Sequence, residues 1–354
     1  MEFLFEYGIF LAKTITLVAA IGFLLVSLTS ATQRLKKLEK QGYVEVKSLN
    51  DKYHEISQTM QAAILSDDDY EAVVKLEKKA EKAKAKESKV LKKKGGAETS
   101  QKSRLFVIDF DGDIKASDAE MLSEKITAIL TQAKAEDEVV LRLESAGGMV
   151  HSYGFAASQL QRIRNKSIPL TICVDKVAAS GGYMMACIGN KILAAPFAII
   201  GSIGVVAQIP NFNRLLKKHD VDYEVLTAGE YKRTLTMLGE NTEKGRQKFQ
   251  DEIQETHNLF KDFVAASRPN LNMETVATGE TWFGKKAAEL LLVDQIMTSE
   301  EYLFSRYPDV DIYHIGWIEK HGIAERFGLA VEASIDRMLN RAFSRLKNRK
   351  VFLQ

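Results

Sequence analysis

Between residues 104 and 305, short apolar runs alternate with stretches of helical periodicity, and this alternation constrains the fold more than any other feature of the chain. The apolar runs are rich in β-branched residues and have the length of strands, whereas the stretches between them are typical of helices. Such alternation predicts an α/β domain with a mostly parallel sheet. The strands are expected at residues 105–110, 138–143 and 170–174, and the helices at 118–132, 152–164 and 241–266, the last capped by Asn241 or Thr242.

Ser180 lies between the strand expected at 170–174 and a helix expected at 183–187. At a strand-to-helix turn, the first N–H groups of the helix are free and the positive end of its dipole is close. Both features stabilise an alkoxide nucleophile and a developing oxyanion. The neighbouring residues are small enough to admit a substrate backbone: Ala178, Ala179, Gly181 and Gly182. The position therefore predicts acyl transfer by a serine.

The base that would activate this serine is not evident from spacing alone. The G-x-S-x-G pattern is missing because Ala178 stands where the first glycine would be. His151 and His257 are the histidines within plausible reach, and neither has an acidic neighbour in a triad pattern. Lys232 follows a strand-like run at 223–226. A lysine acts as a general base only where burial or nearby cations lower its pKa to about 7–8, and most lysines in such a chain are solvated surface charges.

Four short motifs bring a family resemblance: Ser-Ala-Gly-Gly at 145–148, Val-Ala-Ala-Ser-Gly-Gly-Tyr at 177–183, Gly-Ser-Ile-Gly-Val at 201–205 and Tyr-Lys-Arg at 231–233. In this order they resemble the signal peptide peptidase A family of bacterial serine peptidases. Within that family the match is to the SohB type, the shorter members with one catalytic domain behind a membrane anchor. The resemblance implies that Ser180 is the nucleophile and Lys232 the general base of a Ser–Lys dyad, with Lys176 the weaker candidate for the base.

The resemblance also implies a ClpP/crotonase-like fold, a superhelix of β-β-α units. The oxyanion hole would be formed by the N–H groups of Gly148 and Gly181, with Gly147 shaping the turn. The first motif usually reads Ser-Pro-Gly-Gly in the family, whereas Ala146 replaces the proline here. Alanine frees one φ angle before the turn, so we expect a small effect on stability and none on the mechanism.

The N-terminus reads as a transmembrane anchor. Residues 7–28 are apolar except for Lys13, about the length that crosses a ~30 Å hydrocarbon core. An uncleaved anchor is favoured over a signal peptide because no Lys or Arg precedes the long apolar run. Basic residues follow the span: Arg34, Lys36, Lys37 and Lys40. By the positive-inside rule, they favour a cytoplasmic location for the residues that follow the span. Family members are thought to act outside the cytoplasm, so either side of the bacterial inner membrane is kept as an alternative for the catalytic domain.

A second apolar stretch, residues 192–210, has no charge but is not expected to be a span. Pro196, Gly201 and Gly204 would interrupt a helix, and the residues between them fit short buried strands at 194, 199–200 and 205–206. This stretch is therefore predicted to belong to the core.

Four regions follow from these patterns: an anchor at 1–30, a charged linker at 31–103, a serine peptidase domain at 104–305 and an extension at 306–354. Within the linker, residues 71–94 predict a long solvated helix or weak coiled coil, a spacer with a possible affinity for anionic lipid. The extension carries a basic amphipathic helix at 332–349. This helix would pack on its own domain, on a ring formed by several subunits or on the membrane.

Composition excludes some classes of function. The net charge of +2 gives no reason to propose nucleic-acid binding, and the charged stretch at 71–94 lacks aromatic residues for it. Cys173 and Cys187 lie in apolar runs without metal-ligand spacing, which indicates core residues rather than ligands. No metal or cofactor is implied, because a Ser–Lys dyad needs neither.

The sequence thus predicts a membrane-anchored serine endopeptidase. The residues expected around its substrate are small or apolar: Gly147, Met149, Val150, Tyr183, Ile203 and Val205. They indicate cleavage within apolar segments, such as signal-peptide remnants or membrane-protein fragments. An acyl-CoA enzyme of the crotonase type is the main alternative, but it needs neither Ser180 nor an anchor. A non-catalytic membrane scaffold of the same fold would be expected to have lost Ser180 or Lys232.

The motif set occurs once in this chain, whereas family members that carry it twice bring serine and lysine together from different domains. A single copy would then complete its site by association, with Ser180 facing Lys232 of a neighbouring subunit in a closed ring. Relatives of this length suggest an octamer.

Overall fold

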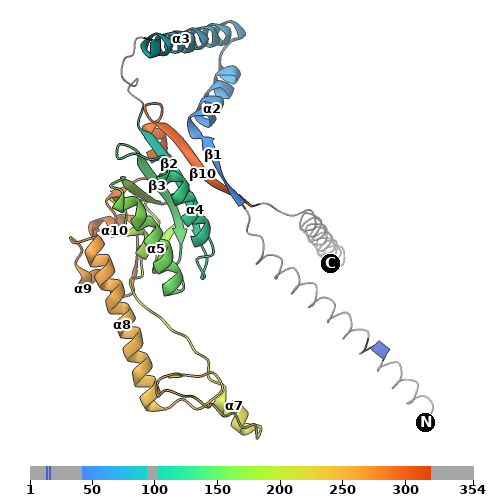
Figure 1. The fold of residues 1–354 in the computed structure, drawn as a ribbon, viewed down its shortest axis with the longest axis vertical. Coiled ribbons are helices and arrows are strands. Elements are labelled where there is room, and N and C mark those ends of the chain that lie inside the picture. Colours follow the sequence, from blue (N-terminus) through green and yellow to red (C-terminus); the bar gives the residue numbers. More distant parts are fainter. Residues whose placement is uncertain (1–12, 15, 17–41, 94–101, 320–354) are drawn as a thin grey trace, which may run out of the picture. The chain divides into compact units, whose positions relative to one another are not determined.

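A computed structural model describes residues 13–14, 16, 42–93 and 102–319 (Figure 1). The predicted anchor lies outside these residues except for Lys13, Thr14 and Thr16, and so does the amphipathic helix at 332–349. Within the described ranges, no helix is long and apolar enough to cross a membrane. The chain divides into two compact units, residues 1–43 with 317–354 and residues 44–316, and the candidate site lies wholly in the second.

One sheet of ten strands organises the described residues, in the order β1-β10-β2-β3-β4-β6-β9, with β5 between β3 and β7, and β8 beyond β7. From β10 to β9 the pairs are parallel, as are β3–β5 and β5–β7, whereas β7–β8 is antiparallel. The strands are β1 (Gly42–Ser48), β2 (Arg104–Gly112), β3 (Glu138–Ser145), β4 (Leu170–Val174), β5 (Val177–Ala179), β6 (Lys191–Ala194), β7 (Ile199–Gly201), β8 (Thr281–Phe283), β9 (Gln295–Ile296) and β10 (Asp311–Glu319).

Helices cover both faces of this sheet, and those described are α2 (Leu49–Ile64), α3 (Asp67–Lys93), α4 (Ala119–Leu130), α5 (Val150–Asn165), α6 (Gly181–Ala186), α7 (Asn213–Lys218), α8 (Glu243–Ser267), α9 (Met273–Val276), α10 (Gly284–Glu289) and α11 (Ser299–Arg306). Alternate residues of β2 point to opposite faces, as the period of a strand requires. Ile108 and Phe110 join the larger core under α4, α5 and α6, whereas Leu105 and Val107 join a smaller core with α11. The sheet is therefore buried on both sides, which explains its continuous apolar runs.

The predicted α/β fold with a parallel sheet is confirmed. The three expected strands are β2, β3 and β4, and the expected helices are α4, α5 and α8. Thr242 rather than Asn241 caps α8, since its Oγ1 accepts the N–H of Gly245. The strands expected at 194 and 199–200 belong to β6 and β7.

Two local predictions were wrong, because residues 205–206 and 223–226 form no strand. Both lie in the long excursion between β7 and α8, residues 205–242, which we call the arm. A strand needs a neighbouring edge to accept its backbone hydrogen bonds. Among the described residues of the arm α7 is the only regular element, and the sheet does not reach it.

Two regions outside the expected catalytic range contribute to the unit. β1 and α2 fall within the stretch predicted as linker, and Leu49 and Tyr53 of α2 pack against the smaller core. β10 falls within the predicted extension and lies between β1 and β2 in the sheet. The charged helix expected at 71–94 is part of α3.

The two cysteines are free and belong to different cores. Cys173 lies in the smaller core and Cys187 in the larger one. Burial raises the pKa of each thiol to about 12, so both stay protonated and act as small apolar residues.

A buried ion pair fixes the start of β2. The carboxylate of Asp137, 2% exposed, accepts Nη2 of Arg104 at 2.6 Å and the N–H groups of Arg104 and Lys134 at 3.0 and 2.8 Å. Burial alone would raise the pKa of Asp137, but these donors hold it below its ordinary value.

We expect Asp137→Asn to lower the free energy of unfolding at pH 7 by about 3 kcal/mol, because Arg104 then lacks its charge partner. A lowered pKa stabilises the fold above the unfolded value of about 3.9, and this contribution is lost as pH falls below it. Urea unfolding of both proteins from pH 7 to pH 3 checks this. Equal stability at pH 7, or a gap that widens on acidification, contradicts it.

Candidate active site

Ser180 lies at the turn between β5 and α6, at the N-cap position of the helix. Its backbone has φ 52° and ψ −119°, a conformation that costs a non-glycine residue of order 1–3 kcal/mol. The conformation is held by hydrogen bonds on both sides, from Ser180 N–H to Gly201 O at 2.8 Å and from Met184 N–H to Ser180 O at 3.0 Å. This is the strained strand–turn–helix of a nucleophile elbow, although Ala178 replaces the first glycine of that motif.

Two free N–H groups lie beside this serine. The N–H of Gly181 belongs to the first turn of α6 and has no carbonyl to bond within the helix. Gly148 lies in the turn after β3, and no described group accepts its N–H. The two turns are in contact, since a Cβ built on Gly147 would be 2.7 Å from both Gly181 N and Ser180 Cβ. The arrangement is suited to an oxyanion that develops next to Ser180.

A cavity of about 80 Å³ opens at Ser180. Five of the residues predicted for the site line it, namely Gly148, Val150, Ser180, Gly181 and Val205. The sequence analysis missed five of the lining residues: Met184, Gly204, Val206, Thr256 and Phe260. Thr256 and Phe260 come from α8, whose contact with α6 is tertiary and therefore leaves no local pattern in the sequence. Every lining side chain is apolar or neutral.

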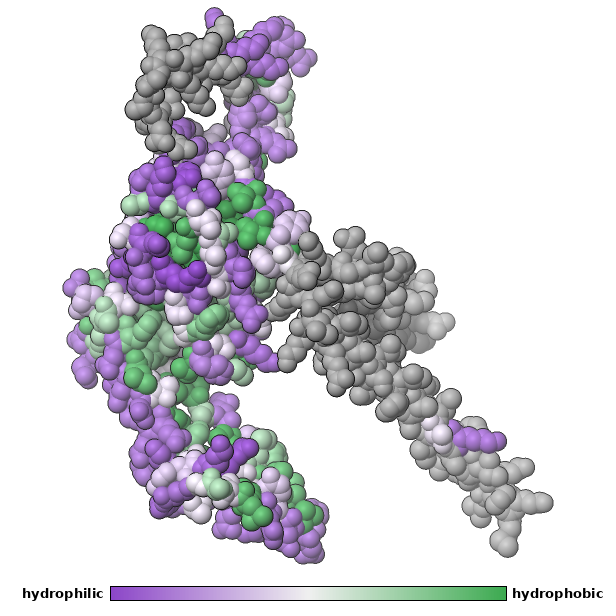
Figure 2. Space-filling model, viewed as in Figure 1, coloured by the Kyte–Doolittle hydropathy of each residue, from purple (hydrophilic) through white to green (hydrophobic). Residues whose placement is uncertain are grey.

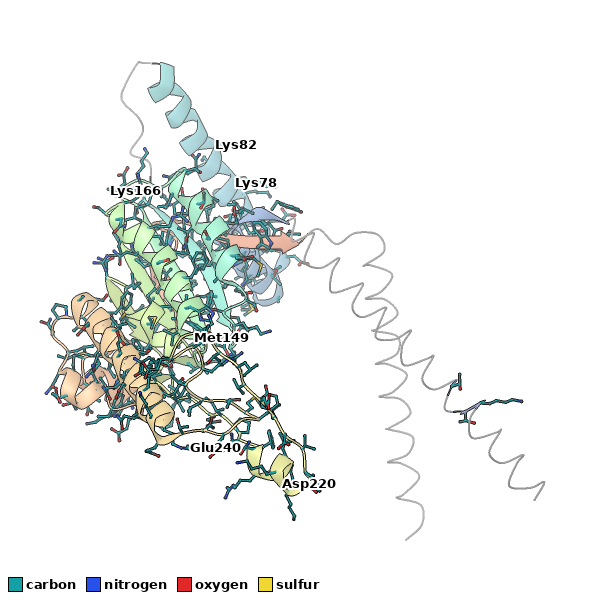
Figure 3. The ribbon with its side chains drawn as sticks, turned by 60° about the horizontal axis from the view of Figure 1, so that its bottom comes forward. Lys78, Lys82, Met149, Lys166, Asp220 and Glu240 are labelled. Carbon is teal, nitrogen blue, oxygen red and sulfur yellow. The ribbon has the colours of Figure 1, made fainter. Side chains whose placement is uncertain are left out.

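The other predicted lining residues lie elsewhere. Tyr183 and Ile203 are fully buried in the larger core, and Tyr183 donates its hydroxyl to Leu292 O at 2.9 Å. Neither residue lines the cavity at Ser180. Tyr183, three positions after Ser180 on α6, turns its side chain toward the core. Gly147 shapes the turn from outside the cavity. Met149 is 42% exposed and lies at the end of the core from which the arm, marked by Asp220 and Glu240, extends (Figure 3).

Lys232 does not meet Ser180 within this chain. It lies in the arm, exposed, where its N–H donates to Gly229 O at 3.2 Å. It lines a separate open cavity of about 1060 Å³, formed by arm residues alone. The cavity at Ser180 and the cavity at Lys232 share no residue.

None of the other candidate bases lines the cavity at Ser180. Lys176, the weaker candidate, is exposed and paired with Glu144 at 2.8 Å, and this hydrogen bond raises the pKa of its ammonium group. It is thereby held protonated, which is the wrong state for a base. His257 contacts Ile203 O at 3.2 Å through Nε2, and His151 is exposed on α5.

Lys125 is a lysine that the sequence analysis did not single out. It is 7% exposed on α4, and burial lowers the pKa of its ammonium group. Its Nζ donates to Asp109 O at 2.7 Å, and it does not line the cavity at Ser180. We assign it a structural role, since a buried lysine needs such an acceptor.

A strained serine at a helix N-terminus, with two free N–H groups beside it on a parallel α/β sheet, defines a serine hydrolase. Comparison with known proteins identifies which kind. Residues 2–160 match the model of the N-terminal region of peptidase family S49, and residues 162–306 match that of peptidase family S49 itself. The chain belongs to this family of serine proteases, not to the acyl-CoA enzymes considered above.

Several named proteases are similar in sequence to this chain. The chain is 50% identical over 341 residues, 96% of each protein, to "Probable protease SohB" of Haemophilus influenzae. It is 54% identical over 244 residues to "Probable protease SohB" of Buchnera aphidicola from Acyrthosiphon pisum, covering 69% of this chain and 73% of that one. A more distant relative, "Serine protease SPPA, chloroplastic" of Arabidopsis thaliana, is 31% identical over half of this chain and 26% of its own.

The glycine at position 148 offers a test of the site. A Cβ there would be 2.1 Å from Ile114 O, so Gly148→Ala must displace the turn and with it the N–H group that is expected to bind the oxyanion. We expect peptide hydrolysis to fall by at least about 100-fold, the usual cost of losing such a donor. Gly154→Ala is the matched control, because no atom lies within 4 Å of its Cβ position on α5.

Gly154→Ala should keep full activity and gain about 1 kcal/mol of stability from helix propensity. Steady-state hydrolysis and thermal unfolding of both variants check the pair. Full activity of a folded Gly148→Ala protein would remove this turn from the site.

Proposed function

We propose that this protein is a membrane-anchored serine endopeptidase in which Ser180 is the nucleophile, Gly148 and Gly181 form the oxyanion hole, and Lys232 is the general base. The observation that carries the proposal is the strained Ser180 backbone beside two unpaired N–H groups. Strain of this kind persists where the surrounding structure requires it, and such sites are commonly functional.

In the proposed reaction, the ε-amino group of Lys232 accepts the hydroxyl proton of Ser180 as Oγ attacks the carbonyl carbon of the substrate. The N–H groups of Gly148 and Gly181 stabilise the oxyanion of the tetrahedral intermediate. Lys232 then donates the proton to the leaving amine, and the peptide bond breaks to leave an acyl-enzyme. A water molecule, deprotonated by the same lysine, hydrolyses the ester and restores Ser180.

We propose further that Lys232 reaches Ser180 from a neighbouring copy of the chain in a closed ring, with an octamer as the expected size. Two observations support this. The residues that line the cavity at Ser180 include no titratable side chain, so the chain's own cavity lacks a base. The arm exposes large apolar side chains, with Val206 82% and Leu226 91% exposed (Figure 2). Large apolar side chains exposed in this way are a feature of surfaces that bind another protein.

The proposed substrates are apolar peptide segments, such as signal-peptide remnants or fragments of membrane proteins. The cavity at Ser180 is small, and its wall includes Val150, Met184, Val205 and Phe260. An anchor at residues 7–28 in the bacterial inner membrane would keep the enzyme near such substrates, and the side of the membrane is left open. The proposed architecture is the ClpP/crotonase-like superhelix. A peptide library cleaved preferentially beside charged residues would contradict this substrate class.

Labelling by a fluorophosphonate probe tests the nucleophile. We expect the purified full chain to be labelled at Ser180, and both Ser180→Ala and Lys232→Ala to lose labelling and peptide hydrolysis by at least about 1000-fold, since each member of a catalytic pair is needed. Lys176→Ala serves as the control and should keep its activity. Peptide mapping of the labelled protein locates the probe, and labelling that survives in Ser180→Ala would refute the assignment.

Mixing inactive subunits tests the shared dyad. When Ser180→Ala and Lys232→Ala chains are unfolded and assembled together, some interfaces should pair an intact serine with an intact lysine. In a random equal mixture about one interface in four would be intact if each dyad spans one interface between two subunits. We therefore expect about a quarter of the wild-type rate. Well-mixed rings without activity would place the dyad within one chain.

A further inference from the structure

A chain of hydrogen bonds runs behind the proposed oxyanion hole. Ser145, the last residue of β3, is 2% exposed, and its Oγ accepts the N–H of Gly147 at 3.0 Å. The same Oγ lies 2.5 Å from Oη of Tyr153, which is fully buried on α5. Tyr153 Oη in turn lies 2.7 Å from the carbonyl oxygen of Asp113, in the segment after β2.

The direction of each hydrogen bond follows from the donors present. A carbonyl oxygen only accepts, so Tyr153 donates its single hydroxyl proton to Asp113 O. Tyr153 then accepts at Oη from Ser145, whose hydroxyl also lies 3.4 Å from Gly112 O, and Ser145 Oγ in turn accepts from the Gly147 N–H. Burial raises the pKa of Tyr153, which keeps its hydroxyl protonated and able to donate. The order is therefore Gly147 N–H, Ser145 O–H, Tyr153 O–H and Asp113 C=O.

Packing connects this chain of bonds to both proposed oxyanion donors. The ring of Tyr153 lies against the backbone of Gly181, because a Cβ on that glycine would be 2.4 Å from Tyr153 Cγ. Gly147, whose φ is +90°, lies against Cβ of Ser180 and the backbone nitrogen of Gly181. The next residue is Gly148, and the turn continues to Met149, whose N–H donates to Ile114 O at 2.9 Å. A shift of the Ser145 or Tyr153 hydroxyl would therefore move the two N–H groups relative to each other.

We propose that Ser145 and Tyr153 are positioning residues for the oxyanion hole, which hold the N–H groups of Gly148 and Gly181 at the separation that the tetrahedral intermediate requires. The proposal rests on the proposed function of those two N–H groups. Neither side chain lines the cavity at Ser180, so neither touches the substrate. Their contribution lies in preorganisation, which is effective because donors fixed in advance need no rearrangement during the reaction.

The role predicts a specific kinetic pattern. Without the Ser145 hydroxyl, Gly147 N–H loses its acceptor and the turn relaxes, whereas the apolar wall that binds substrate is unchanged. The rate constant kcat should therefore fall while KM stays nearly constant, because only the transition state carries the oxyanion. Tyr153→Phe keeps the ring on Gly181 and removes only Oη, so its effect should be smaller.

The experiment compares Ser145→Ala, Tyr153→Phe and the double variant of the full chain with wild type. We expect kcat to fall about 10- to 100-fold in Ser145→Ala and about 3- to 10-fold in Tyr153→Phe, below the ~10²–10³-fold cost of deleting an oxyanion donor. KM should stay within about twofold. A peptide aldehyde, whose hemiacetal with Ser180 places an oxygen in the hole, should lose affinity by the same factor as kcat.

Two further readouts separate positioning from general damage. Because both hydroxyls belong to one chain of bonds, the double variant should resemble Ser145→Ala rather than show the product of the two effects. Tyr302→Phe is the matched control, since it also removes the hydroxyl of a buried tyrosine. Tyr302 donates to Glu138 at 2.5 Å and lies on the face of the sheet opposite to Tyr153, so its loss should leave kcat unchanged. Thermal unfolding verifies that each variant is folded.

Folded variants with wild-type kcat, or a fall in kcat without a matching loss of aldehyde affinity, would overturn the positioning role. The proposed function is judged separately by the labelling of wild type. If the probe does not modify Ser180 in the wild-type protein, the catalytic assignment fails, whereas labelled wild type with unaffected Ser145 and Tyr153 variants refutes only the present inference.

Discussion

Close packing at Gly147, Gly148 and Gly181 is the contact on which the candidate site depends. Gly147 lies against the backbone nitrogen of Gly181, Gly148 against the carbonyl of Ile114, and Gly181 against the ring of Tyr153. A Cβ at any of these positions would lie within 2.1–2.7 Å of a neighbouring atom. Only glycine lets the turn after β3 and the start of α6 approach so closely. The proximity brings Gly148 and Gly181 to the same cavity as Ser180.

The parallel sheet determines where this contact forms. β3 and β5 are paired at Ser145 and Ala178, so the residues that follow both strands leave the sheet at the same edge. β3 is followed by the glycine turn, and β5 by Ser180. Strands that run in the same direction end together, and for this reason sites in parallel α/β proteins lie at the carboxyl ends of strands. The network of Ser145 and Tyr153 then ties this edge to α5.

The α/β fold with its parallel sheet and the strand-to-helix position of Ser180 were predictable from the sequence because local patterns encode them. Buried strands and amphipathic helices leave a periodic record, and the small residues around Ser180 mark a turn. The surroundings of the serine were less predictable. Thr256 and Phe260 reach the cavity from α8, and Tyr183 turns into the core, because tertiary packing rather than spacing decides both. Residues 223–226 have the apolar composition of a strand but no edge to pair with, and sequence alone does not reveal a missing partner.

The lack of a titratable group in the cavity at Ser180 has a consequence for the newly made chain. A serine without a base is an ordinary alcohol, unreactive toward amides at neutral pH. On the proposal that the lysine comes from a neighbour, a newly made chain is inactive until it assembles. Subunit concentration then controls when activity begins, and the cell is protected from the enzyme until enough copies have accumulated to assemble.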